Sequence, residues 1–200
     1  MNIELANRAL IKIGQSPISS ANQEPLGKII SIVYDEVKLL LLSSYCWRFA
    51  IKRATLPRLN KESENPRFKN VFQLPKDCLL FRGVGDFHKP ADLRDYKGTT
   101  GTRWEIEGDK IYSNLDSLPV VYIANVDEEL FSAQFKEAFS NKLASELSIK
   151  VHQNLNLVNL YEQKYQASIQ HAITCNEIIA DTEELSENSW LAVREGWRID

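Results

Sequence analysis

The stretch SSYCWRFAIKRATLPRL, residues 43–59, marks the point where the sequence pattern changes from helical to extended. Before it, apolar residues recur every three to four positions through residues 25–44, which predicts an amphipathic helix. From Trp47 onward, apolar and polar residues alternate with a period of about two, which is typical of strands. Trp47, Phe49 and Ile51 would then face the core from one side, and the cations between them would face solvent.

The same segment supplies four candidate interface residues, Arg48, Lys52, Arg53 and Arg58. Three interpretations of these cations are open: an interface with another protein, a weak contact with DNA, or a solvated face without a partner. Arginine forms planar bidentate pairs with carboxylates, which favours Arg48 and Arg53 as salt-bridge residues. A nucleic-acid site would need an exposed aromatic platform beside the cations, whereas these aromatics are expected in the core. We therefore favour the protein interface.

Working outward from this stretch, helical periodicity occurs in two blocks on either side of a region with strand-like alternation. The best local signal is WEIEGDKIYS, residues 104–113, where two alternating runs flank Gly108-Asp109, a suitable two-residue hairpin turn. The predicted helices are residues 3–14, 25–44, 128–151 and 155–181, and the predicted strands are 71–74, 79–84, 103–107, 110–113 and 120–126. No predicted helix can bury its apolar stripe alone, so we expect the four to pack as one bundle.

The expected fold class is α+β, a four-helix bundle with a central β-rich insertion and an extended C-terminal tail. Its parts are residues 1–46 and 127–181 for the two halves of the bundle, 47–126 for the insertion and 182–200 for the tail. Trp190, Leu191, Arg194 and Trp197 are candidate interface residues because they are large anchors on a polar, acidic segment. This tail is expected either to fold back on its own bundle or to dock on another chain.

Composition limits the class of protein. The chain has 200 residues, a net charge of -3, 44% hydrophobic and 26% charged residues, which fits an ordinary globular protein. Its longest apolar runs, residues 39–42 and 120–124, are far shorter than the ~20 residues that a membrane span needs. Three scattered cysteines do not form a disulfide framework and indicate a reducing compartment, and the N-terminal residues do not resemble a secretory signal.

Charge is distributed unevenly along the chain. Residues 48–103 contain thirteen Lys/Arg against six Asp/Glu, whereas residues 177–200 contain two against seven. A basic middle and an acidic end suggest complementary surfaces, within one molecule or between copies.

No motif for catalysis, a cofactor or a metal is found. His88, His152 and His171 are far apart, and no Cys or His pair has ligand spacing. No phosphate-binding or nucleophile-elbow motif occurs, and adjacent carboxylates on a helix point in different directions. We therefore expect no catalytic, cofactor or metal site.

Five segments together resemble one family. They are ANRALIKIGQSPISS (6–20), YDEVKLLLLSSYCWRFAIKRATL (34–56), FQLPKDCLLF (72–81), VVYIANVDEELFSAQFKEAFSNKLASELS (120–148) and SENSWLAVREG (186–196). In this order and spacing they resemble the head-to-tail adaptors of short-tailed bacteriophages, the tail tubular protein A family. Residues 60–70 and 86–102 have no counterpart in that pattern.

The resemblance implies a non-enzymatic virion protein at the head–tail junction. Family members form a dodecameric ring that binds the portal protein and the tail nozzle protein, and double-stranded DNA passes through the ring without sequence-specific contact. It also implies a location in the host cytoplasm before assembly, with no membrane attachment. Two alternatives are a nucleic-acid-binding protein that uses the basic 48–103 region and, less favoured, a tail-associated peptidoglycan hydrolase. We expect the isolated chain to be largely monomeric and to form the ring on the portal.

Overall fold

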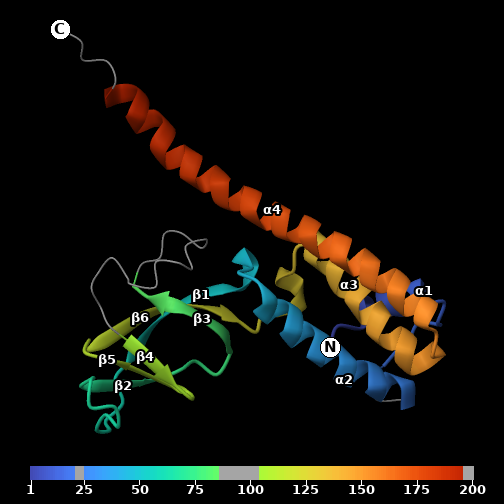
Figure 1. Ribbon diagram of the computed structural model, residues 1–200, viewed down its shortest axis with the longest axis horizontal. Helices are drawn as coiled ribbons and strands as arrows, with labels where there is room; N and C mark the ends of the chain where they lie inside the picture. The colour runs from blue at the N-terminus through green and yellow to red at the C-terminus, as the bar shows by residue number, and fades with distance from the viewer. Residues whose placement is uncertain (21–24, 86–103, 196–200) are drawn as a thin grey trace. The chain divides into compact units, whose positions relative to one another are not determined.

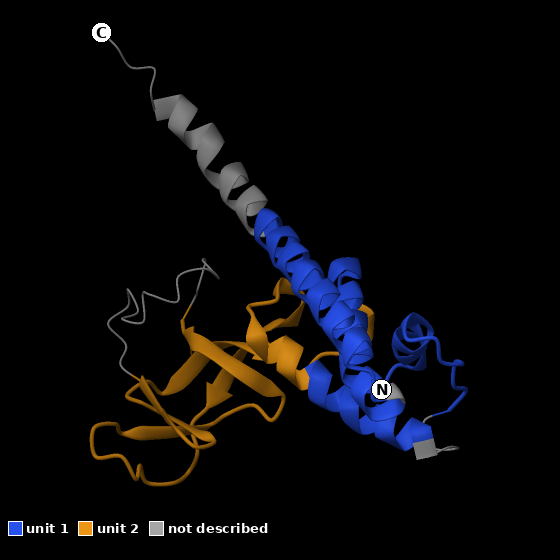
Figure 2. Ribbon diagram, turned by 45° about the vertical axis from the view of Figure 1, so that its right-hand side comes forward, with its two compact units in different colours: residues 1–38, 131–200 blue, residues 39–130 orange. Residues whose placement is uncertain are grey.

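A computed structural model describes residues 1–20, 25–85 and 104–195 of the chain. It divides into two compact units, residues 1–38 with 131–200, here called the helical unit, and residues 39–130, here called the β unit (Figure 2). Each unit is described by itself.

The helical unit begins with α1 (Ile3–Lys12), which is positioned by local hydrogen bonds. The Asn2 side chain caps its first turn by accepting from the Leu5 amide at 3.2 Å. After the helix ends, Gly14 turns the chain with a φ of 77°, a conformation that a residue with a side chain rarely adopts. The Asn7 side chain then bonds both backbone groups of Ile18, at 2.8 and 3.0 Å, and closes the turn.

Aromatic side chains form the core around α3 (Ala133–Leu147). Phe131 and Phe135 meet edge to face with centroids 4.7 Å apart, and Phe139 packs on Tyr34 of α2 (Pro25–Ser44) at 4.8 Å. Ser132 caps α3 by accepting from the Phe135 amide at 3.2 Å.

The helix predicted over 128–151 is shorter than expected at both ends. Residues Glu128–Leu130 form a short 3-10 turn, and α3 begins only after the Ser132 cap because this side chain replaces a helical backbone bond. After Leu147 the helix widens into a π turn, Ser148–His152, and ends at Gln153 with a φ of 51°.

The prediction of a four-helix bundle is wrong. The helices α1, α3 and α4 (Leu155–Glu195) pack in the helical unit, but α2 is shared: its residues up to Lys38 belong to the helical unit and the rest to the β unit (Figures 1 and 2). The physical reason is that the apolar stripe of α2 is divided between the two units. Tyr34 packs on Phe139, whereas Leu41 and Leu42 are fully buried within the part that belongs to the β unit.

The extended C-terminal tail predicted for 182–200 is also wrong over residues 182–195, because α4 continues through Glu195, and residues 196–200 lie outside the described part. The segment from 181 to 195 contains many good helix formers and neither glycine nor proline, so nothing in it ends the helix. The first helix-stopping residue is Gly196, which lies outside the described residues.

The β unit contains two antiparallel sheets. One has the order β1-β6-β3, formed by Ile51–Pro57, Ser117–Ala124 and Cys78–Val84, and the other has the order β2-β5-β4, formed by Asn70–Gln73, Lys110–Ser113 and Trp104–Glu107 (Figure 1). The predicted hairpin is confirmed: Glu107 pairs with Lys110 across the two-residue turn, and Gly108 has a φ of 61°.

Residues 43–59 fold differently from the continuous strand that was expected from Trp47 onward. Arg48–Ala50 form a 3-10 turn, and β1 starts at Ile51. Trp47 is 1% exposed and its indole nitrogen donates to the Leu41 carbonyl at 2.8 Å, while Phe49 stacks on it at 5.9 Å. Trp47 is therefore a core residue, as predicted, whereas Phe49 is half-buried, and a turn rather than strand alternation places both of them.

Candidate functional site

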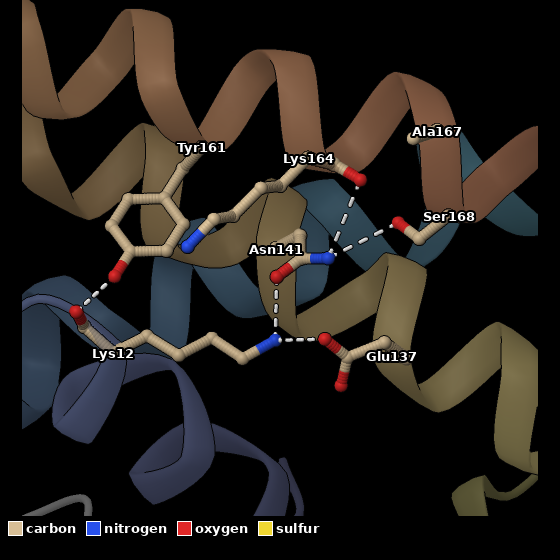
Figure 3. A pocket seen from close by; sticks show the side chains of 7 residues that line it. All are labelled: Lys12, Glu137, Asn141, Tyr161, Lys164, Ala167 and Ser168. Carbon is tan, nitrogen blue, oxygen red and sulfur yellow. Dashed lines mark hydrogen bonds and ion pairs between the residues drawn. The ribbon is translucent and has the colours of Figure 1, made fainter.

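The most concentrated polar cluster in the described structure lies in the helical unit, around the last residue of α1 (Figure 3). The Lys12 ammonium donates to Glu137 Oε1 at 2.7 Å, to Ser140 Oγ at 2.8 Å and to Asn141 Oδ1, all on α3. Arg8, one turn earlier on α1, lies 3.7 Å from the second oxygen of Glu137. Three acceptors thus take up the three N–H donors of one lysine.

Asn141 extends this network to α4. The residue is 3% exposed, and its amide nitrogen donates to Ser168 Oγ at 3.1 Å and to the Lys164 carbonyl at 3.5 Å. The Tyr161 hydroxyl donates to the Lys12 carbonyl. The cluster therefore joins α1, α3 and α4 by side chains that leave few polar groups without a partner.

Burial and charge act in opposite directions on the central ion pair. Burial lowers the pKa of Lys12, helped by the charges of Arg8 and Lys164 and only partly opposed by Glu137. Burial alone would raise the pKa of Glu137, but the hydrogen bond and charge of Lys12, together with Arg8, outweigh it and hold that pKa below its usual value. Because the ammonium donates to a carboxylate and to an amide oxygen, the charged pair is the state that this geometry holds.

A hollow of about 450 Å³ opens beside the cluster. Its lining residues are Lys12, Glu137, Asn141, Tyr161, Lys164, Ala167 and Ser168. The exposed Lys164 places its ammonium 4.9 Å from the centroid of the Tyr161 ring (Figure 3). The three N–H donors of Lys12 are taken up by Glu137, Ser140 and Asn141, which disfavours a role for this lysine as a nucleophile.

Within residues 1–20, 25–85 and 104–195, no three His, Cys, Asp or Glu side chains gather as metal ligands. In that same part of the chain, no helix combines the length and apolar character that crossing a bilayer needs.

The predicted interface residues of the β unit do not form one site. Lys52 on β1 pairs with Asp77 at 2.7 Å, and the other oxygen of Asp77 accepts from the Tyr122 hydroxyl at 3.2 Å. Arg58 is exposed and lies 3.9 Å from Asp116. These cations make contacts within their own unit, although their side chains stay accessible.

The remaining predicted residues lie in different surroundings. Arg48 is half-buried in the 3-10 turn, and Arg53 is exposed on β1. Trp190, Leu191 and Arg194 fall within α4, but their side chains are outside the described part, and Trp197 is outside the described residues altogether.

A second hollow, of about 360 Å³, lies in the β unit beside the end of β1. It is lined by Arg58, Leu59, Asn60, Lys61, Glu62, Lys69 and Asn70. Its three cations and two amides are polar donors, but Lys61 also pairs with Glu64. Its excess of positive charge is therefore small.

Sequence reasoning missed the cluster around Lys12. The signal was present in and just after α3, where polar residues occupy buried positions: Ser140, Asn141 and Ser145 in the helix, and Ser148 directly after it. Buried polar groups need partners, so polar residues at helical spacing among the Phe and Leu positions indicate a hydrogen-bonded cluster.

Comparison with known proteins adds no relative. The sequence matches none of the protein-family models compared with it, and no curated protein matches it significantly.

Proposed function

We propose that this chain is a structural virion protein, a subunit of a head-to-tail adaptor ring between the portal and the tail nozzle of a short-tailed phage. The observation that carries the proposal is where the residues of the five resembling segments lie. In the described part, their polar side chains connect elements of the chain rather than converge on a reaction centre.

Four residues of these segments illustrate this use. In the first segment (6–20), Asn7 closes the turn after α1, and Lys12 connects α1 to α3. In the second segment (34–56), the Trp47 side chain donates a hydrogen bond to the end of α2. In the third segment (72–81), Asp77 accepts hydrogen bonds from Lys52 of β1 and Tyr122 of β6. Because these residues connect secondary-structure elements, the resemblance supports a shared architecture. Function is then inferred by analogy with that architecture.

The element order is compatible with the same proposal. Two helices precede the β region and two follow it, and the last helix has 41 residues. We assign the β unit to contacts with the nozzle, and the helical unit with α4 to contacts with neighbouring copies and the portal. Trp190, Leu191, Arg194 and Trp197 are the proposed portal anchors, since Trp and Arg are favoured at interface centres.

In this proposal the protein has no catalytic role. The occupied donors of Lys12 argue against a lysine nucleophile. A peptidoglycan hydrolase of the two-carboxylate type would need acids facing each other across a cleft. The larger hollow in the helical unit is lined by one carboxylate, Glu137.

The test is electron microscopy and light scattering of the purified chain, alone and mixed with the portal protein of the same phage genome. We expect monomers alone and closed rings on the portal, because a portal raises the local concentration of subunits with weak lateral contacts. No attachment to the portal, or hydrolysis of purified peptidoglycan, would reject the proposal.

Nucleic-acid binding is the second candidate function, and the hollow lined by Arg58, Lys61 and Lys69 favours it. Such binding would be weak and independent of sequence, because the hollow also contains Glu62 and the whole chain is acidic. Submicromolar affinity for one DNA sequence at physiological salt would favour this function over the adaptor.

A further inference from the structure

Positive charge exceeds negative charge around the hollow of the helical unit. Lys12 and Lys164 line it together with one carboxylate, Glu137, and Arg8 approaches the far oxygen of that carboxylate. Both oxygens of Glu137 are engaged, by Lys12 and by Arg8. Among the described residues no carboxylate pairs with Lys164, whose ammonium lies over the Tyr161 ring. A further oxyanion would therefore be attracted to this hollow.

The hollow suits a side-chain carboxylate rather than a large ligand. Most of its polar groups already bond one another, whereas no dashed line reaches the ammonium of the exposed Lys164 in Figure 3. Its volume of about 450 Å³ is ample for one or two acidic side chains. Recognition would rest on the charge of Lys164, whose side chain is exposed, so the ion pair should weaken as the ionic strength rises.

The chain itself has a segment with the complementary charge. Residues 177–200 contain seven Asp/Glu and two Lys/Arg. This segment cannot reach the hollow of its own molecule, because α4 is one helix through Glu195 and rises about 1.5 Å per residue. Glu177 is thus about 20 Å and Glu195 about 46 Å along the helix axis from Lys164. The last five residues span at most about 18 Å when extended, so they cannot return either.

We propose that the acidic C-terminal segment of a second copy, residues 177–200, docks its carboxylates in this hollow. The contact joins two different surfaces of the same chain, so it is heterologous and generates a ring when the rotation closes. This contact deepens the proposed function, because it would be one lateral contact between subunits of the ring. Closure of the ring rests on the proposed function. The docking itself requires no portal.

The test measures binding of a labelled peptide with residues 177–200 to the full-length chain by fluorescence anisotropy. We expect binding at low ionic strength that weakens with added salt. Lys164→Glu should weaken it about three- to fivefold or more, because one ion pair is lost and one repulsion gained. The matched control is Lys28→Glu, which changes an exposed lysine of α2 outside the hollow and should alter affinity less than about twofold.

A charge exchange separates docking from general attraction. A peptide in which Glu183, Glu184 and Glu187 are replaced by lysine should lose affinity for the natural chain and gain affinity for Lys164→Glu. Absence of peptide binding, equal losses in the two lysine variants, or no recovery in the exchanged pair would each overturn the proposal. Displacement of the peptide by inorganic phosphate beyond the effect of chloride at equal ionic strength would instead assign the hollow to a small oxyanion. Because no portal is present, failure here is distinguishable from failure of the adaptor function.

Discussion

Lys12→Met removes the centre of the network between α1, α3 and α4 and should destabilise the helical unit. The change deletes the donors to Glu137, Ser140 and Asn141 but keeps an unbranched apolar chain of similar length. The helices themselves should persist, so the expected effect is a loss of stability rather than a loss of secondary structure.

The magnitude follows from what each partner retains. The Asn141 oxygen loses its ammonium donor at a residue that is 3% exposed, which costs about 1–3 kcal/mol. The Glu137 side chain is 46% exposed and keeps Arg8, so losing its pair with Lys12 costs at most about 1 kcal/mol. Ser140 still donates to the Glu137 carbonyl at 2.9 Å and adds little. We expect a total loss of about 2–3 kcal/mol in the free energy of unfolding.

Urea unfolding followed by far-ultraviolet circular dichroism measures this loss. The slope of the free energy of unfolding against urea concentration should stay unchanged, which indicates the same unfolding transition. The control is Lys164→Met, which removes an exposed cation of the same hollow and should change stability by less than about 0.5 kcal/mol. Equal stability of the two variants would refute the argument that the Lys12 network holds the three helices together.

Three further substitutions test other side-chain contacts that connect parts of the chain. Trp47→Phe should cost about 1–3 kcal/mol by urea unfolding, because a buried indole is replaced by a smaller ring and its 2.8 Å hydrogen bond is lost; a loss below about 0.5 kcal/mol, as at an ordinary surface site, would contradict the core role. Asn7→Ala should cost about 1–3 kcal/mol, since both backbone groups of Ile18 lose their partner, and thermal unfolding that matches the natural chain would count against it. The hydrogen bond from Lys52 holds the pKa of Asp77 below its usual value, so Asp77 stabilises the fold at pH values above its unfolded pKa and this contribution disappears as the pH falls through the lowered pKa. Asp77→Asn should therefore lose less stability than the natural chain as the pH falls through that lowered pKa, by less than about 1 kcal/mol because the pair is exposed, and parallel acid profiles would exclude this role.

Local patterns in the sequence predicted the elements better than their packing. The alternation on each side of Gly108 was sufficient for the hairpin, because register and turn type are decided within a few residues. The apolar stripe of α2 correctly predicted a helix, but the pattern does not show that one stripe can be divided between two units, so the bundle was predicted wrongly. Polarity led to the prediction of an extended C-terminal segment, whereas propensity and the lack of breakers allow α4 to continue.

The candidate site was harder to predict because it depends on long-range contacts. Lys12 and Glu137 are brought together only by packing of α1 on α3, and no spacing in the sequence expresses that pairing. The basic residues predicted around β1 were easier to notice, yet Lys52 and Arg58 make separate pairs within the β unit. The charge contrast along the chain indicated complementary surfaces, within one molecule or between copies, and the docking between copies proposed here stays a prediction.

The polar residues on the buried face of α3 have a consequence for how uniquely the helices align. Asn141 and Ser145 each form a hydrogen bond at one fixed position along α4. Asn141 bonds the Ser168 hydroxyl, and Ser145 bonds the Val158 carbonyl at 3.4 Å. Sliding α4 by one turn, about 5.4 Å, would keep apolar groups in contact but separate both polar pairs inside the core. These residues therefore select one register of α4 against α3 from several that apolar packing alone would allow, as a single buried asparagine does in a coiled coil. Apolar neighbours can consequently be exchanged for others of similar volume, whereas a one-residue insertion in α4 between Val158 and Ser168 should lose the alignment altogether.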